Sequence, residues 1–251
     1  MGIKNRLITM SFLQFFVWGA WLITIANYWF GTKQWEGTQF GLVFGTMGIA
    51  SLFMPTLTGI IADRWINAEK LYGILHILYA AVLFSFPFVE TPTAFIYVML
   101  LAMCFYMPTI SLSNSISYTS LKLSNKDVVK DFPPIRVFGT IGFIVAMWIT
   151  NLTGNKATEY QFYIAGIAAL ILGFYAFTLP KCEPQKLTKE NATLSETLGL
   201  EAFKFFADYK MALFFIFSMF LGGALQLTNA YGDVFLDEFK HFPKYADSFV
   251  V

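Results

Sequence analysis

An arginine, a threonine and a phenylalanine follow one another at helical spacing in a largely apolar stretch of this 251-residue chain. Arg136, Thr140 and Phe143 stand at i, i+4 and i+7, so their side chains share one face of a helix. A guanidinium offers a planar fork of donors that suits oxygen-rich ligands, and an aromatic ring can stack on a base. The alternative is that Arg136 extends to lipid headgroups while Thr140 and Phe143 only pack.

A second pair of polar residues lies on a later apolar stretch. Gln226 and Asn229 are i, i+3 neighbours and share a helix face. Their amides offer donors and acceptors, which suits sugar hydroxyls and base edges. The same amides can instead join helices within a membrane, a contact that contributes about 0.6 kcal/mol on average. The spacing leaves both interpretations open.

A charged pair follows the second apolar block. The segment Gly-x-x-x-Asp63-Arg64 resembles the start of the loop between helices two and three in the major facilitator superfamily. The chain departs from that pattern, because Ile66, Asn67 and Ala68 stand where glycine and basic residues are usual. We expect Asp63 and Arg64 to act at an inner gate; the alternative is an incidental charge at the membrane edge.

Chemistry that moves protons within a membrane needs a group there that takes up and releases a proton. No Asp or Glu lies deep in any apolar block. His76 is a possible relay, although a single histidine on an apolar helix more often packs through a hydrogen bond. Three possibilities stay open: a proton-binding acid lies beyond the end of this chain, His76 serves, or any coupling is not to protons.

Other kinds of chemistry are not indicated. The sequence has no phosphate-binding Gly-Lys-Ser/Thr loop, no paired catalytic carboxylates and no metal-ligand spacing. Its two cysteines lie far apart, so no disulfide framework is predicted. We expect no enzyme activity, no cofactor, no metal and no nucleic-acid partner.

The composition indicates that lipid surrounds most of the chain. Hydrophobic residues make up 57% and charged residues 13%, whereas an ordinary soluble domain is about 25% charged. A bilayer core requires roughly 20 apolar residues in a helix. Seven blocks meet this length, at residues 8–30, 38–61, 71–89, 94–118, 134–152, 160–179 and 211–235. The sequence thus predicts an all-α polytopic membrane protein.

Basic residues predict the orientation of these spans. With the N-terminus inside, 12 Lys and Arg residues fall on the inner segments and 4 on the outer ones. Because Lys and Arg concentrate on cytoplasmic loops, the N-terminus is expected in the cytoplasm.

The spacing of the spans suggests three regions. We expect a six-helix transmembrane bundle at 1–179, a polar cytoplasmic linker at 180–210, and the start of a second bundle at 211–251. In the linker, Thr193 and Glu196 have capping-box spacing, which predicts an amphipathic helix; a plain tether is the alternative. The apolar ending 248–251 is expected to begin an eighth helix, so the chain would be the first part of the six-plus-six major facilitator superfamily fold.

Several motifs resemble those of the bacterial nucleoside:proton symporters of that superfamily. They are Ser11-Phe-Leu-Gln-Phe15, Trp18-Gly-Ala-Trp21, Phe53-Met-Pro55, Tyr106-Met-Pro-Thr109, Asp131-Phe-Pro-Pro-Ile-Arg136, Gly139-Thr-Ile-Gly-Phe143 and Phe214-Phe-Ile-Phe-Ser-Met219. The resemblance implies that the residues Arg136, Thr140, Phe143, Gln226 and Asn229 hold a nucleoside.

The resemblance also implies proton-coupled uptake of purine or pyrimidine nucleosides, uridine among them, by alternating access. It places a multi-pass monomer in the bacterial inner membrane. Two other functions remain possible: a proton-coupled carrier of a sugar or another small polar solute, and a membrane sensor that no longer transports.

Overall fold

A computed structural model describes residues 2–184 and 200–239 of the chain. The chain separates into two compact units, residues 1–186 and 187–251, and each is described by itself. Every regular element among the described residues is helical, which confirms the predicted all-α class.

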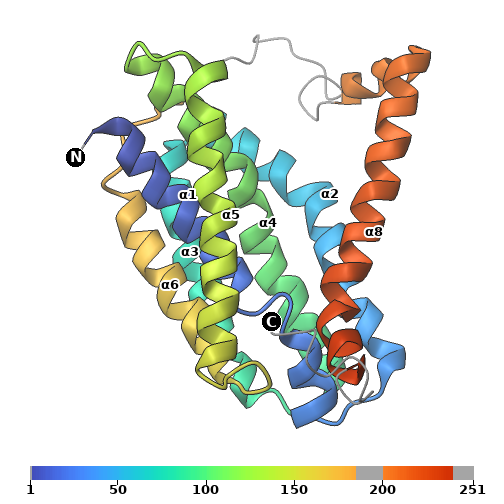
Figure 1. Ribbon diagram of the computed structural model, residues 1–251. Helices are drawn as coiled ribbons and strands as arrows, with labels where there is room; N and C mark the ends of the chain where they lie inside the picture. The colour runs from blue at the N-terminus through green and yellow to red at the C-terminus, as the bar shows by residue number, and fades with distance from the viewer. Residues whose placement is uncertain (1, 185–199, 240–251) are drawn as a thin grey trace. The chain divides into compact units, whose positions relative to one another are not determined.

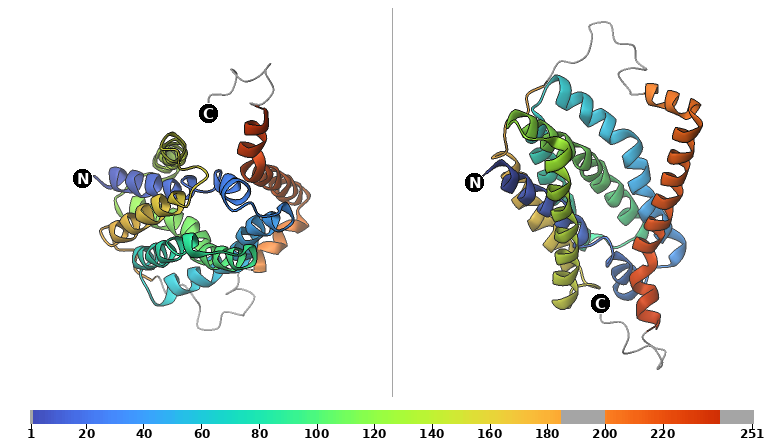
Figure 2. Two further views of the ribbon diagram at one scale, coloured as in Figure 1. Left: turned by 90° about the horizontal axis from the view of Figure 1, so that it is seen from below. Right: turned by 45° about the horizontal axis from the view of Figure 1, so that its top comes forward.

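The first unit is a bundle of six α-helices (Figure 1). They are α1 (Ile3–Gly19), α2 (Phe40–Arg64), α3 (Ala68–Leu83), α4 (Pro92–Leu123), α5 (Val128–Leu152) and α6 (Tyr160–Ala176). Short helical turns occur at Asn27–Thr32, Gly37–Gln39 and Phe86–Phe88. Helix α1 packs mainly on α5 and also on α6, so it lies between these two helices, as Figure 2 shows from below. Helix α4 contacts α2 and α3.

In the described ranges 2–184 and 200–239, five helices are long and apolar enough to cross a membrane, namely α2 with its preceding turn, α3 with its following turn, α4, α5 and α8. They match five of the seven predicted spans. Helix α6 has 17 residues and is shorter than the predicted span at 160–179. The helix ends at Ala176, and the last three residues of the predicted span, 177–179, form a turn and a bend instead of continuing the helix.

The predicted first span at 8–30 is not one continuous helix. Helix α1 ends at Gly19, and turns lead to a wide π-helical turn at Asn27–Thr32. In a regular helix the carbonyl of Ala20 would accept a hydrogen bond from the backbone of Thr24. Here the hydroxyl of Thr150 in α5 donates to that carbonyl at 3.0 Å, so packing partners from other helices satisfy the interrupted backbone.

Glycines allow α1 and α5 to approach closely. A Cβ atom added at Gly142 would overlap the carbonyl oxygen of Phe12, and one at Gly19 would overlap that of Phe143. The Gly-x-x-x-Gly pair Gly41 and Gly45 has no described atom within 4 Å of such a Cβ. The close approach of α1 and α5 therefore depends on Gly19 and Gly142, and not on Gly41 and Gly45.

The second unit contains a short 3₁₀ helix (Leu200–Ala207) and the long helix α8 (Tyr209–Phe239). Helix α8 includes the predicted span at 211–235. Asp208 begins it, because its carboxylate accepts a hydrogen bond from the Met211 backbone at 3.0 Å. The predicted capping box at Thr193 and the helix start at 248–251 lie outside the described residues. The three predicted domain boundaries stay predictions.

Candidate functional site

Helix α5 carries the predicted arginine, and it begins earlier than expected. Asp127 caps it, since its Oδ1 accepts hydrogen bonds from the backbone of Val129 at 2.9 Å and of Lys130 at 3.3 Å. The span predicted from the sequence starts at Pro134. The structure instead has Pro133 and Pro134 inside α5, because the cap at Asp127 allows the helix to form before them.

The acidic residue of the same motif anchors this end of α5 to α1. Asp131 lies 2.6 Å from Lys4 through Oδ1 and Nζ. Because this pair satisfies both charges, Asp131 is not available to Arg136 as a counter-ion. The pair fixes the start of α5 against the start of α1.

Arg136 is half-buried and lies against α1 rather than against an acid. Its guanidinium carbon is 3.8 Å from the centroid of the Phe15 ring, which is the geometry of a cation–π contact. Within residues 2–184 it has no carboxylate at ion-pair distance. A charged donor group inside a helical bundle without an acidic partner is a strong indicator of a ligand site.

Arg136 and Thr140 face a common hollow on α5. The hollow has a volume of about 420 Å³ and is lined by Phe132, Pro133, Arg136, Val137 and Thr140. Phe143 lies one turn further along, where its ring stands edge-on to Trp18 with centroids 6.4 Å apart. The structure thus places the three predicted residues on one side of α5, with the first two in the hollow.

Gln226 and Asn229 lie on α8, in the second unit. Both are partly buried, and their spacing puts them on one face of that helix, as predicted. Since the two units are described separately, these residues are placed on their own helix only.

Asp63 and Arg64 are the last two residues of α2 and are exposed. Neither forms an ion pair among residues 2–184 and 200–239. Their position at a helix end is the one that the gating hypothesis requires.

His76 is fully buried in α3. Its Nδ1 donates to the Tyr72 carbonyl at 3.0 Å, and its ring lies 4.4 Å from the Tyr72 ring. Its Nε2 has no partner in the part of the chain that the structure describes. The side chain is therefore held by its own helix and by aromatic packing.

A buried polar centre was missed by the sequence reasoning. Gln14 of α1 is fully buried and donates through Nε2 to Thr109 at 2.9 Å. Its Oε1 accepts from the Tyr72 hydroxyl at 2.5 Å, and its backbone carbonyl accepts from the Tyr106 hydroxyl at 2.8 Å. A lone glutamine in an apolar helix was the visible signal, but its partners lie in α3 and α4 and only the fold reveals them.

Known proteins resemble the chain along its full length. It is 47% identical to xanthosine permease and 45% identical to nucleoside permease NupG, both from Escherichia coli (strain K12). Each alignment covers 100% of this chain and 60% of the relative. Among solved structures, a mutant of the nucleoside transporter NupG has a TM-score of 0.89 at 44% identity, with 62% of that chain covered.

The chain thus spans about 60% of the length of the curated relatives it matches. The model of the nucleoside H+ symporter family matches residues 1–251. A match over every residue, together with helices of the required length and a polar face on α5, assigns the chain: it belongs to the nucleoside H+ symporter family.

Proposed function

We propose that the protein takes up purine or pyrimidine nucleosides, uridine among them, together with protons. The match of the whole chain to the nucleoside H+ symporter family carries this proposal. The names of two relatives, a xanthosine permease and a nucleoside permease, point to the same class of substrate. Arg136 supports it, because its donors face a hollow without an acidic partner among the described residues.

In this proposal transport proceeds by alternating access, with two helical halves rocking about a central site. Arg136 donates hydrogen bonds to nucleoside oxygens, Thr140 adds a hydroxyl, and Phe143 lines the site. Gln226 and Asn229 on α8 contribute amide groups to hydroxyls or base edges. Asp63 and Arg64, at the end of α2, belong to the inner gate.

Two acids of the first unit, Glu69 and Asp131, are not proposed as the proton-binding group. Glu69 accepts a hydrogen bond from the Cys182 backbone at 2.8 Å, and Asp131 is paired with Lys4. Both acids lie in the first turn of their helices, so neither sits in the middle of a span. His76 is the one relay candidate that we retain from the described spans.

We further propose a monomer that spans the bacterial inner membrane several times with its N-terminus in the cytoplasm. The excess of Lys and Arg on the segments that this orientation places inside supports it.

Uptake of radiolabelled uridine tests the function. Cells that lack their own nucleoside carriers and express the full-length protein should accumulate uridine, and a protonophore should abolish the accumulation. Unlabelled adenosine or xanthosine should compete, whereas free ribose should compete poorly because it lacks a base. Competition by ribose at the concentration at which uridine competes would identify a sugar carrier, and binding without accumulation would identify a sensor.

A further inference from the structure

The direction of the Arg136 side chain is informative. Side chains of helical residues normally lean toward the N-terminus of their helix, and a lysine or arginine that reaches for headgroups near the start of a span would do the same. The guanidinium of Arg136 turns the other way. Its Nη1 lies 2.8 Å from the point where a Cβ atom of Gly139 would be, one turn further into α5.

Gly139 and Phe15 together make room for this conformation. A Cβ atom at Gly139 would lie 2.6 Å from Cδ2 of Phe15 and 3.0 Å from the Ser11 hydroxyl, besides its clash with Arg136. Phe15 itself is 7% exposed and packs against Trp18 at 6.3 Å between ring centroids. The ring is therefore fixed by α1, and the guanidinium fills the space that the missing side chain of Gly139 leaves.

The stack also determines which donors Arg136 can offer. The ring of Phe15 lies 3.8 Å from the guanidinium carbon. A cation held against an aromatic face retains its in-plane N–H donors, because the contact uses the π-system rather than a hydrogen bond. An acid in the same place would have consumed those donors.

We propose that Phe15 is a positioning residue for nucleoside recognition: its ring, with the space at Gly139, turns the Arg136 guanidinium away from the headgroups and toward the substrate. The inference rests on the proposed function, since it concerns the same arginine. Phe15 acts through Arg136 and not by touching the nucleoside.

Uridine uptake kinetics by the full-length protein test this role. Phe15→Leu removes the aromatic face, and its KM should rise about fivefold at unchanged Vmax per expressed transporter, as expected for the loss of one partly desolvated cation–π contact. Phe15→Tyr keeps the ring and should restore the wild-type KM. A side chain that only fills space would not separate KM from Vmax or distinguish these two variants.

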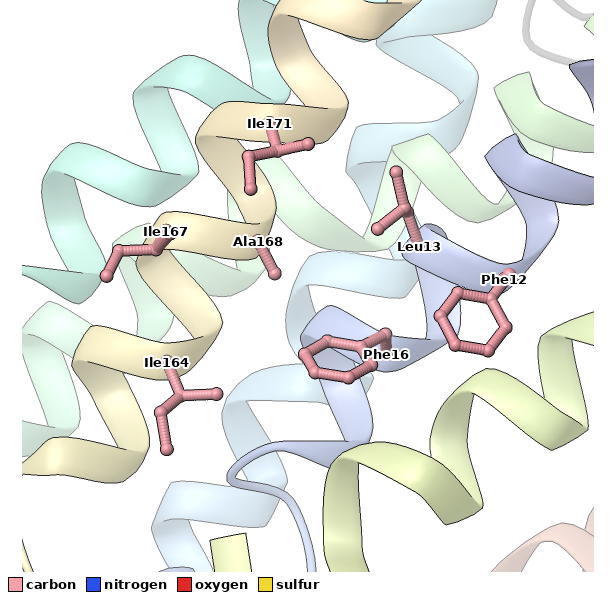
Figure 3. Close-up of a pocket in the computed structure, with 7 residues that line it drawn as sticks. All are labelled: Phe12, Leu13, Phe16, Ile164, Ile167, Ala168 and Ile171. Atoms are coloured by element: carbon pink, nitrogen blue, oxygen red, sulfur yellow. The ribbon is translucent and has the colours of Figure 1, made fainter. Parts of the chain in front are cut away.

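The matched control is Phe16→Leu. Phe16 follows on the same helix, but its ring lines a separate apolar groove between α1 and α6 with Phe12 and Ile164 (Figure 3). Its KM should stay at the wild-type value. A wild-type KM for Phe15→Leu, or equal increases for Phe15→Leu and Phe16→Leu, would overturn the proposal.

A second variant keeps the test decisive if Phe15→Leu does not reach the membrane. Gly139→Ala displaces the guanidinium from its seat and should raise KM as well, whereas Gly41→Ala, at a position with open space, should not. A wild-type KM for Gly139→Ala would contradict the positioning role of Phe15 but not the proposed function. Absence of uridine uptake by the wild type, or full uptake by Arg136→Ala, counts instead against the proposed function.

Discussion

The hydroxyl of Thr150 in α5 donates to the backbone carbonyl of Ala20 at 3.0 Å, where the first span leaves the regular helix. Both residues are fully buried. Because the hydrocarbon core of a bilayer offers no water to the backbone, an interrupted helix needs other hydrogen-bond partners, and here a neighbouring helix provides one. The contact is therefore one of the interactions that hold α1 in its broken form.

Thr150→Val should destabilise the protein by about 1–3 kcal/mol, because the Ala20 carbonyl loses its donor while the volume is nearly conserved. Thr150→Ser keeps the hydroxyl and serves as the control. Thermal unfolding of detergent-solubilised protein, followed by size-exclusion chromatography, measures the difference. Equal melting temperatures for the Val and Ser variants would show that this hydrogen bond contributes nothing.

The buried Gln14 amide should couple energetically to Thr109. Thr109→Val leaves the Gln14 Nε2 without its partner at 2.9 Å, which should cost about 1–3 kcal/mol of stability. In a Gln14→Leu background the same change should cost less, since the partner is already absent. Ser113→Ala is the control, because the Ser113 hydroxyl donates only within its own helix, to Ile110 at 2.8 Å. Additive effects of the two changes at Gln14 and Thr109 would rule out the coupling.

Two glycine substitutions should have different effects on the stability of the protein. Gly142→Ala forces a methyl group onto the Phe12 carbonyl, and overpacking of this kind costs about 1–3 kcal/mol. Gly45→Ala, in open space within α2, should be neutral or should stabilise by up to about 1 kcal/mol, since alanine favours helix more than glycine does. The melting temperatures of the two variants measure both effects, and a loss at Gly45 as large as at Gly142 would show that α2 has a close partner there.

The thiol of Cys182 should react slowly with alkylating reagents. Burial and the nearby Glu69 carboxylate raise its pKa to about 11, and the thiolate is the reactive form. In a Cys104→Ala background, the alkylation rate at pH 7.5 should be at least about a hundredfold below that of an ordinary thiol, and it should rise about tenfold per pH unit up to pH 11.

Glu69→Gln removes the negative charge and keeps an acceptor for the Cys182 backbone, so it should lower the thiol pKa and accelerate alkylation at neutral pH. A rate that does not change in Glu69→Gln would exclude the electrostatic contribution of Glu69. Mass spectrometry of the labelled peptide follows both rates.

Periodicity and length were sufficient to predict most of the helices. The apolar blocks that became α2 to α5 and α8 meet the length that a membrane requires, and no tertiary contact is needed to infer them. The break after Gly19 could not be predicted, because it depends on a hydroxyl 130 positions away in α5. The early start of α5 was missed for a local reason, since the prediction did not consider Asp127 as a helix cap.

For the candidate site, spacing placed Arg136 and Thr140 on one face of α5, and the structure has both in one hollow. Their surroundings were not predictable. Neither the stack of Arg136 on Phe15 nor the pair of Asp131 with Lys4 follows from sequence neighbours, because each joins α5 to α1 across the bundle. Helical periodicity predicts which residues share a helix face, whereas the packing of the helices determines which residues that face contacts.

The most direct measurement of the central claim is uridine uptake by Arg136→Ala and Arg136→Lys variants of the full-length protein at matched surface expression. Arg136 donates charged hydrogen bonds to the nucleoside in this account, and such bonds contribute about 1.5–3 kcal/mol. Arg136→Ala should therefore lower Vmax/KM about 10-fold to 100-fold, and Arg136→Lys should recover part of it, because lysine restores the charge without the planar fork. Wild-type uptake by Arg136→Ala would contradict the account.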